Sequence, residues 1–146
     1  MSDVIIPEGF VERRYAPFST HIGPFYYKKE SLEDGSFKGW VGVPFQQHHI
    51  GGNNRGHGGL LLTLLDEAMG MNASYAKGKP SPVVTLSMQT NFIAATLPGN
   101  FIKATGQITH VTNTVAFVDG VAWCGDTLVG TASGVWKYLK VPNTAF

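Results

Sequence analysis

The sequence predicts an α+β domain in which one long central helix is wrapped by an antiparallel β-sheet. Residues 59–77 are apolar on almost every side and long enough for a helix of about 28 Å, at a rise of roughly 1.5 Å per residue. Residues 83–138 are rich in Val, Ile, Thr and aromatic side chains, which favour strands. A helix of that length needs a broad surface to pack against, and a sheet supplies it. We expect residues 1–146 to form one domain.

Shorter elements are expected before the long helix. A short helix is predicted around residues 10–14, between two prolines, within an N-terminal extension of residues 1–20. Residues 22–29 and 37–43 predict two strands. The dipeptide Asp34-Gly35 between them is typical of a hairpin turn.

Four strands are expected after the long helix, which should stop at Gly78 and Pro80. These strands are residues 83–93, 100–111, 114–123 and 127–138. The links between them carry Pro98-Gly99, Thr112-Asn113 and Gly125-Asp126. Because these links are short and rich in turn residues, they predict an antiparallel meander.

The face pattern of the long helix places one acid in apolar surroundings. On a helical wheel of about 100° per residue, one face carries Leu60, Leu64, Ala68, Met71 and Tyr75. Asp66 falls on the other face, among Leu62, Thr63, Met69, Gly70 and Ala73. A helix that is apolar all round is usually buried on both sides, where a carboxylate is costly to ionise unless its charge is compensated.

The start of the helix offers hydrogen-bond donors. Gly58, Gly59 and Leu60 present free backbone N–H groups at the positive end of the helix dipole, which suits an anion or a polarised carbonyl oxygen. His57 is expected to brace this turn by bonding to the backbone. An oxyanion site followed about two turns later by a carboxylate suggests acyl-group chemistry.

These motifs resemble the hotdog-fold acyl-CoA thioesterases, in particular the phenylacetate-pathway (PaaI) type. The pattern of that family is roughly H-x-N-x-x-G-x-x-H-G-G, then six residues, then an acid in the central helix. Read without gaps, His49 matches the first His, His57-Gly58-Gly59 match H-G-G, and Asp66 matches the catalytic acid. Thr85 matches a Ser or Thr in the second core strand of the family. The resemblance covers about residues 24–139.

The chain departs from the family pattern at its Asn. The ungapped alignment puts Gly51 where the family has Asn, and Asn54 where the family has Gly. Asn tolerates left-handed backbone almost as Gly does, so Asn54 fits a glycine position. Alternatively, Asn53-Asn54-Arg55-Gly56 supplies the N-x-x-G pattern with a shorter loop, and Asn53 or Asn54 then points into the site.

The resemblance implies a role for each matched residue. The Gly58 N–H, helped by Gly59, would polarise the thioester carbonyl. Asp66 would act as nucleophile or as general base, and Thr85 would orient the attacking water. The family also implies active sites shared between the subunits of a homodimer or homotetramer, with no cofactor.

The implied activity is hydrolysis of an aromatic or medium-chain acyl-CoA to the free acid and CoA. Arg55, and Lys137 or Lys140, are candidate contacts for the phosphates of CoA. Two alternatives remain at this point. The first is a hydratase or dehydratase acting on acyl thioesters. The second is a non-catalytic hotdog domain that binds an acyl thioester or a small acid.

The composition argues against several other functions. With a net charge of +1 and scattered basic residues, the sequence indicates no basic patch that would bind nucleic acid. No apolar stretch reaches about 18 residues, so no membrane span is expected. The start Met1-Ser2-Asp3 does not resemble a signal peptide, and a single Cys124 fits a reducing cytoplasm. With only 14% charged residues, the chain fits a protein that buries surface in an oligomer.

A metal site is not expected in the polar, glycine-rich loop of residues 44–59. This loop carries His48, His49 and His57, whose spacing matches no usual zinc pattern. It also holds no cysteine and no carboxylate that could complete a ligand set.

Overall fold

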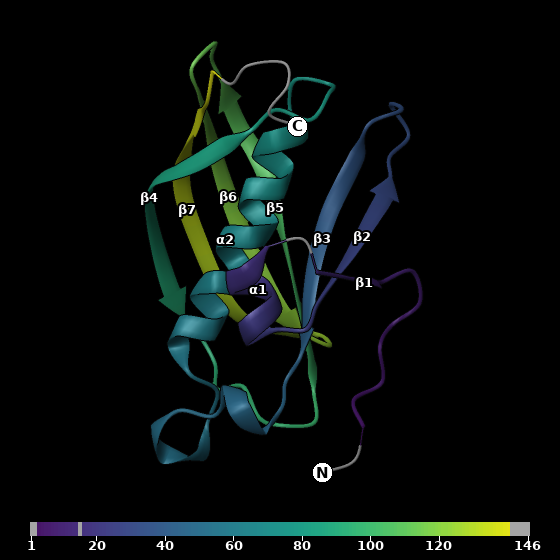
Figure 1. Cartoon of the computed structure of the whole chain (residues 1–146), viewed down its shortest axis with the longest axis vertical. Helices are drawn as coiled ribbons and strands as arrows, with labels where there is room; N and C mark the ends of the chain where they lie inside the picture. Colours follow the sequence, from purple (N-terminus) through teal and green to yellow (C-terminus); the bar gives the residue numbers. More distant parts are fainter. Residues whose placement is uncertain (1–2, 15, 141–146) are drawn as a thin grey trace.

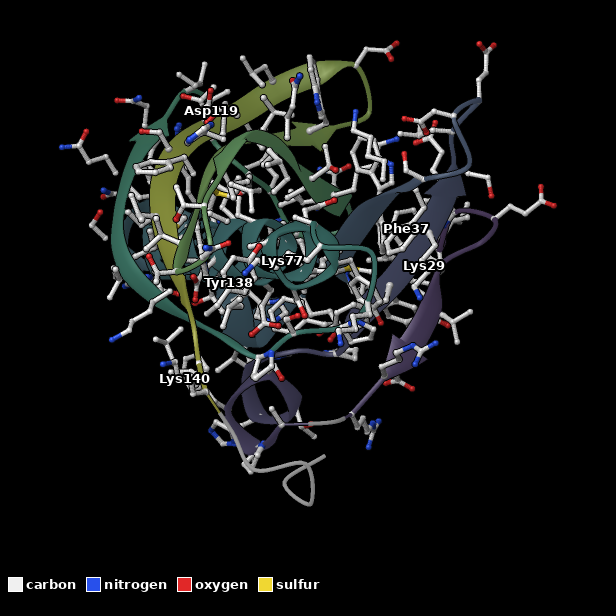
Figure 2. All side chains as sticks on the ribbon, turned by 90° about the horizontal axis from the view of Figure 1, so that it is seen from above. Lys29, Phe37, Lys77, Asp119, Tyr138 and Lys140 are labelled. Atoms are coloured by element: carbon white, nitrogen blue, oxygen red, sulfur yellow. The ribbon has the colours of Figure 1, made fainter. Side chains whose placement is uncertain are left out.

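One antiparallel sheet, curved around one long helix, makes up the fold. The structure is a computed structural model, and it describes residues 3–14 and 16–140. Its elements are β1 (Val11–Arg13), α1 (Pro17–Ile22), β2 (Phe25–Ser31), β3 (Phe37–Pro44), the 3₁₀ turns η1 (Gln47–His49) and η2 (Gly52–Asn54), α2 (Gly58–Tyr75), β4 (Val83–Phe92), β5 (Phe101–Val111), β6 (Val115–Cys124) and β7 (Thr127–Tyr138). Figure 1 shows α2 lying along the strands, and the view along the helix in Figure 2 shows the sheet curving round it. The predicted α+β class is confirmed.

The order of the strands differs in one respect from the expected meander. The sheet runs β1-β2-β3-β5-β6-β7-β4. Strands β5, β6 and β7 form consecutive hairpins, as predicted. Strand β4 does not pair with β5: it pairs with β7 at one edge, while β5 pairs with β3. The link of residues 93–100 is therefore a crossover between distant strands, for which it is long enough, and not a hairpin turn.

The N-terminal expectations were partly wrong. Residues 11–13 form strand β1, which pairs antiparallel with β2, and not a helix. The short helix α1 begins instead at Pro17, because a proline at the first helical position loses no hydrogen bond. Ile22 ends that helix and does not start a strand. The predicted hairpin between β2 and β3 is confirmed, with Gly35 at a φ of +87°.

Helix α2 buries one sector of its surface against the sheet. The buried positions are Leu60, Leu61, Leu64, Leu65, Ala68, Met69, Asn72 and Ala73. The expected division of the helix into faces was therefore wrong for four residues: Met71 and Tyr75 lie outside this sector, whereas Met69 and Ala73 lie within it. The opposite sector, which includes Thr63, Asp66, Glu67 and Gly70, stays half-buried because strands contact it only in part, through single side chains such as Thr85 and Tyr27.

Asn72 joins the helix to the sheet where β3 and β5 separate. The pairing of these strands ends at Trp40 and Thr105, one residue short of Gly39. The Asn72 side chain accepts a hydrogen bond from the Gly39 N–H at 2.9 Å and donates to the Gly39 carbonyl at 3.0 Å. It also donates to Ala68 O at 2.7 Å. The buried amide thus replaces the missing strand partner and fixes the position of α2.

No helix within the described ranges is long and apolar enough to cross a membrane.

Replacing Asn72 with Ala should destabilise the fold by about 2–3 kcal/mol, because it leaves the buried Gly39 N–H without its partner, while Thr105 still donates to the Gly39 carbonyl. Asn100→Ala is the matched control. Its exposed side chain donates only to Leu97 O, so its loss should cost less than about 1 kcal/mol. Urea denaturation of both variants measures the difference, and equal costs would show that the Asn72 contacts contribute little.

Candidate functional site

His57 caps the N-terminus of α2 and leaves one glycine N–H open. The His57 Nδ1 accepts a hydrogen bond from the Gly59 N–H at 2.8 Å, as the expected bracing role requires. Leu60 N–H donates to His57 O at 3.0 Å. Gly59 and Leu60 are therefore already paired, and Gly59 is not available as a second donor to a ligand. Among the described residues, the Gly58 N–H makes no hydrogen bond and remains the donor at this helix end.

A pocket of about 320 Å³ lies beside the open Gly58 N–H. Arg55, His57 and Leu61 line it together with Phe92 at the end of β4 and residues 93–96. A Cβ added at Gly58 would lie 3.3 Å from the Phe92 ring, so the end of β4 sits directly next to the helix start. The pocket therefore gives access to the donor from the open edge of the sheet.

Asn53 and Asn54 form the turn before the helix. Both have left-handed backbone, with φ of 62° and 55°, and both side chains are exposed. Neither side chain makes a hydrogen bond within the described part of the chain. Gly51 N–H donates to Arg55 O at 2.7 Å and closes the turn. Within one chain, the structure does not bring either Asn next to Asp66.

His48 and His49 fasten the loop to α1. Their rings lie 3.8 Å apart. The Nε2 atoms of both rings donate to main-chain carbonyls, that of His48 to Gly23 O at 2.8 Å and that of His49 to Ile22 O. His49 Nδ1 accepts from the Gln46 N–H at 3.0 Å, which requires a neutral ring. Burial is the main cause that lowers the pKa of His49.

Thr85 and Asp66 lie in direct contact. Thr85 Oγ1 donates a hydrogen bond of 2.6 Å to Asp66 Oδ1, from the edge strand to the helix. The pairing of β4 with β7 is irregular between Thr85 and Ser87, where Leu86 is an extra residue. Such bulges bend a strand and redirect its side chains. The sequence prediction that these two residues belong to one site agrees with this contact.

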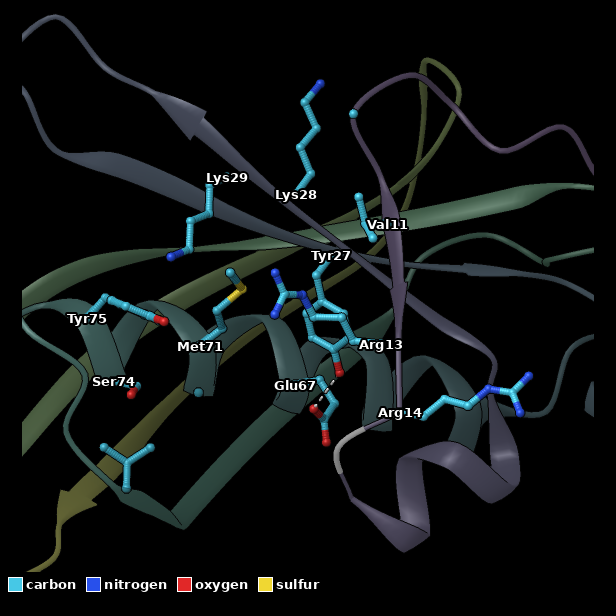
Figure 3. Close-up of a pocket in the computed structure, with 13 residues that line it drawn as sticks. Val11, Arg13, Arg14, Tyr27, Lys28, Lys29, Glu67, Met71, Ser74 and Tyr75 are labelled. Carbon is cyan, nitrogen blue, oxygen red and sulfur yellow. Dashed lines mark hydrogen bonds between the residues drawn. The ribbon is translucent and has the colours of Figure 1, made fainter. Parts of the chain in front are cut away.

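Glu67 lies about 100° further round the helix than Asp66 and faces β2. Its carboxylate accepts a hydrogen bond of 3.3 Å from Tyr27 of β2, drawn as a dashed line in Figure 3. Both residues line an open pocket of about 870 Å³ between α2 and the β1–β2 edge. Sequence reasoning did not find this pocket, because its walls come from segments far apart in the chain.

The candidate basic residues near the C-terminus lie apart from both carboxylates. Lys137 is exposed and lies between two inward-facing residues of β7, so strand alternation places it on the outer face of the sheet. In Figure 2, Lys140 lies beyond the end of that strand, and Lys77 lies against Tyr138 at the end of α2. The Lys77 ammonium is 4.0 Å from the centre of the Tyr138 ring. Arg55 is the candidate that lies next to the Gly58 pocket.

The open helix donor and the acid are far apart within one chain. Gly58 and Asp66 are eight residues apart on α2, which is about 12 Å along the helix axis. One thioester carbonyl group cannot reach both. Within the described ranges, no group of three or more His, Cys, Asp or Glu side chains is placed to hold a metal ion.

Comparisons with known proteins identify the type of domain. The family model of the thioesterase superfamily matches residues 53–131. A Pseudomonas aeruginosa protein named as a presumed esterase is 27% identical over 132 residues, which cover 90% of this chain and 96% of the relative. A Bacillus halodurans protein, solved with CoA, has a TM-score of 0.71 at 24% identity, over 89% of this chain and 83% of the neighbour.

A second solved structure agrees with the resemblance found in the sequence. It is a mutant of the phenylacetic acid degradation protein PaaI from Thermus thermophilus. It has a TM-score of 0.71 at 21% identity, over 85% of this chain and 100% of the neighbour. The hotdog arrangement expected from the sequence is thereby confirmed as the fold.

The buried His49 should make the fold less stable in mild acid. The unfolded ring has a pKa near 6.5, and the folded ring has a lower one. Just below this pH the unfolded chain therefore binds a proton that the folded chain does not bind. The free energy of unfolding should consequently fall as pH decreases through about 6.5. In His49→Gln this part of the fall should be absent. Urea denaturation at pH 7.5 and pH 5.5 tests the prediction, and equal falls in both proteins would contradict it.

Proposed function

Because the chain belongs to the thioesterase superfamily, we propose that it hydrolyses acyl-CoA thioesters to the free acid and CoA. The observation that carries the proposal is the 2.6 Å hydrogen bond between Thr85 and Asp66. It joins a half-buried carboxylate on the open side of α2 to a hydroxyl on the edge strand. The CoA in the Bacillus halodurans neighbour supports the choice of thioester.

In this proposal Asp66 starts the reaction at the thioester carbonyl carbon. As a general base it takes a proton from water while the water oxygen attacks. As a nucleophile it attacks directly, and water then hydrolyses the resulting anhydride. Both routes break the carbon–sulfur bond, and the CoA thiolate takes up a proton as it leaves. Thr85 holds the carboxylate in position and offers its oxygen to the attacking water.

The oxyanion donor for this reaction comes from a second copy of the chain. Since about 12 Å of helix separates Gly58 from Asp66 of the same chain, a complete site needs the Gly58 N–H of a partner. Strand β4 pairs on one side only, with β7, and exposes Val84, Leu86 and Phe92 at its other edge. An exposed apolar edge strand of this kind favours pairing with another strand.

Antiparallel pairing of two β4 strands would complete the site. With the two-fold axis near the middle of the strand, the Phe92 end of one copy faces the Thr85 end of the other. Phe92 adjoins Gly58, and Thr85 contacts Asp66. One symmetric contact therefore brings the donor of each copy to the acid of its partner. A homodimer with two shared sites is the smallest assembly that satisfies this geometry.

Asp66→Asn should lower kcat by at least about a hundredfold, because it keeps the size of the side chain but removes the charge that attacks or takes a proton. Thr85→Ala should cost less, and Glu67→Gln less again, since Glu67 is turned toward Tyr27. Asp119→Asn is the control: Asp119 is exposed on the outer side of the sheet (Figure 2). Thiol release from aromatic and medium-chain acyl-CoAs measures all four variants.

The ranking of these variants decides the assignment. A dead Glu67→Gln with an active Asp66→Asn would mean that the wrong carboxylate has been assigned. No thiol release by the unmodified protein with any acyl-CoA would favour the alternative of a non-catalytic binding domain.

The shared site predicts that two inactive variants restore each other. Gly58→Pro removes the N–H at the first helical position, where proline is well tolerated. Gly58→Ala is its control, because it adds a Cβ against Phe92 but keeps the N–H. A mixed dimer of Gly58→Pro and Asp66→Asn contains one intact site, so random re-pairing should recover about a quarter of the normal activity.

The two variants are unfolded together, refolded and assayed, with each variant refolded alone as a blank. A site built within one chain would show no recovery. Light scattering that finds only a particle of 15.8 kDa would contradict the shared site directly.

A further inference from the structure

The pocket between α2 and the β1–β2 edge holds an unusual concentration of positive charge. Arg13, Arg14, Lys28 and Lys29 line it, with Glu67 as its one acid. The chain as a whole has 11 basic and 10 acidic residues, so this pocket is far from the near-neutral average. Antiparallel pairing of β1 with β2 brings the two basic pairs together from separate parts of the sequence. Such a local excess of positive charge attracts anionic ligands.

Two of these cations lie over the pocket, and two are engaged elsewhere. In Figure 3 the guanidinium of Arg13 lies beside the Tyr27 ring, and the ammonium of Lys29 points along the helix toward Tyr75. Lys29 is 4.4 Å from the centre of the Tyr75 ring. Arg14 points away and pairs with Glu12 at 3.1 Å. Lys28 lies over the Phe10 ring, with its ammonium 5.7 Å from the ring centre.

The pocket begins next to the proposed catalytic acid. Glu67 follows Asp66 in the chain, and Gly70 lies between these two acids on the helical wheel, at about 40° from Asp66. Gly70 has no side chain, and the Trp136 indole lies 3.3 Å from the position that a Cβ would take there. Val83, two residues before Thr85, lines the same pocket. Gly70 and Val83 therefore link the surroundings of the Asp66–Thr85 contact to the pocket, and an acyl chain attached to a carbonyl at Asp66 would enter the pocket along them.

The cations of this pocket suit the acyl end of the substrate better than its CoA end. Arg13 lines the same pocket as Glu67, the residue that follows Asp66 on the helix. The phosphates of CoA are separated from the thioester sulfur by the whole pantetheine arm. A carboxylate at the end of a short acyl chain stays near the carbonyl and can reach the pocket beside Glu67, whereas the phosphates lie at the far end of that arm.

We propose that this pocket selects acyl groups that end in a carboxylate, the thioesters of dicarboxylic acids, and that Arg13 determines this specificity by pairing with the terminal carboxylate. The inference rests on the proposed thioesterase function. The apolar parts of Met71, Tyr75 and Val83 contact the methylene chain. Guanidinium and carboxylate form charge-assisted hydrogen bonds, often two in parallel, which gives the contact its selectivity.

Glu67 sets a limit on the affinity. Its negative charge repels a second carboxylate, and the hydrogen bond from Tyr27 keeps it on the Tyr27 side of the pocket. Removing this charge and removing that of Arg13 should therefore change the binding of an anionic acyl group in opposite directions.

Adipoyl-CoA and hexanoyl-CoA test the proposal, since they share a chain length and differ only in the terminal carboxylate. Binding to the Asp66→Asn protein is measured by calorimetry, which needs no hydrolysis. Adding Arg13→Gln should weaken adipoyl-CoA binding about tenfold or more and leave hexanoyl-CoA within about twofold. Arg13→Lys should restore part of the loss. Adding Glu67→Gln should strengthen adipoyl-CoA binding. Lys79→Gln is the control: it removes an exposed positive charge outside the pocket and should change neither ligand.

Each other outcome has a definite meaning. Equal weakening of both ligands by Arg13→Gln would assign the arginine to CoA and overturn the proposal. Weaker binding of adipoyl-CoA than of hexanoyl-CoA to the starting protein, unaffected by Arg13→Gln, would also overturn it. Failure of the unmodified enzyme to hydrolyse hexanoyl-CoA or adipoyl-CoA would count against the proposed thioesterase activity alone, because the binding measurements stand without it.

Discussion

The one-sided burial of α2 is the constraint on which the rest of the structure depends. Leu64, Leu65, Ala68 and Met69 are fully buried against the concave side of the sheet, which fixes the rotation of the helix. Turning the helix by one residue would move these side chains out of the core and carry the acids into it. Burial of the apolar sector therefore places the polar sector, with both carboxylates, in the opening between the two edges of the sheet.

Small local features of the backbone then position the reactive groups. The bulge at Leu86 lies directly after Thr85 and redirects the strand where its hydroxyl meets Asp66. The His57 cap uses the Gly59 N–H and so leaves the Gly58 N–H as the open donor. The turn before it is closed by left-handed Asn53 and Asn54, which need no side-chain contact for that role.

Elements that depend on local sequence pattern were predicted correctly. The pairing of distant strands and the buried sector of α2 were not. The long helix, the hairpin at Gly35 and β7 were predicted within a residue or two, because periodicity and turn residues specify them. The family pattern also placed Asp66 and Thr85 in one site, but it did not predict that they meet within one chain. The edge position of β4 was missed, since no local signal says which strand a segment pairs with. The buried sector of α2 was misjudged because a helix that is apolar on most sides gives no indication of which sector faces the sheet.

The positive charge of the pocket also could not be predicted from the sequence, because it depends on which strands pair. Arg13 and Lys28 are unremarkable in the sequence, and β1 is three exposed residues that become a strand only by pairing with β2. Once they pair, the basic residues face a helix on which Asp66 and Glu67 diverge by about 100°. One acid meets the hydroxyl of β4 and the other meets the phenol of β2. Because Asp66 and Glu67 face different edges of one curved sheet, Asp66 lies in the proposed catalytic site and Glu67 lies in the adjacent pocket.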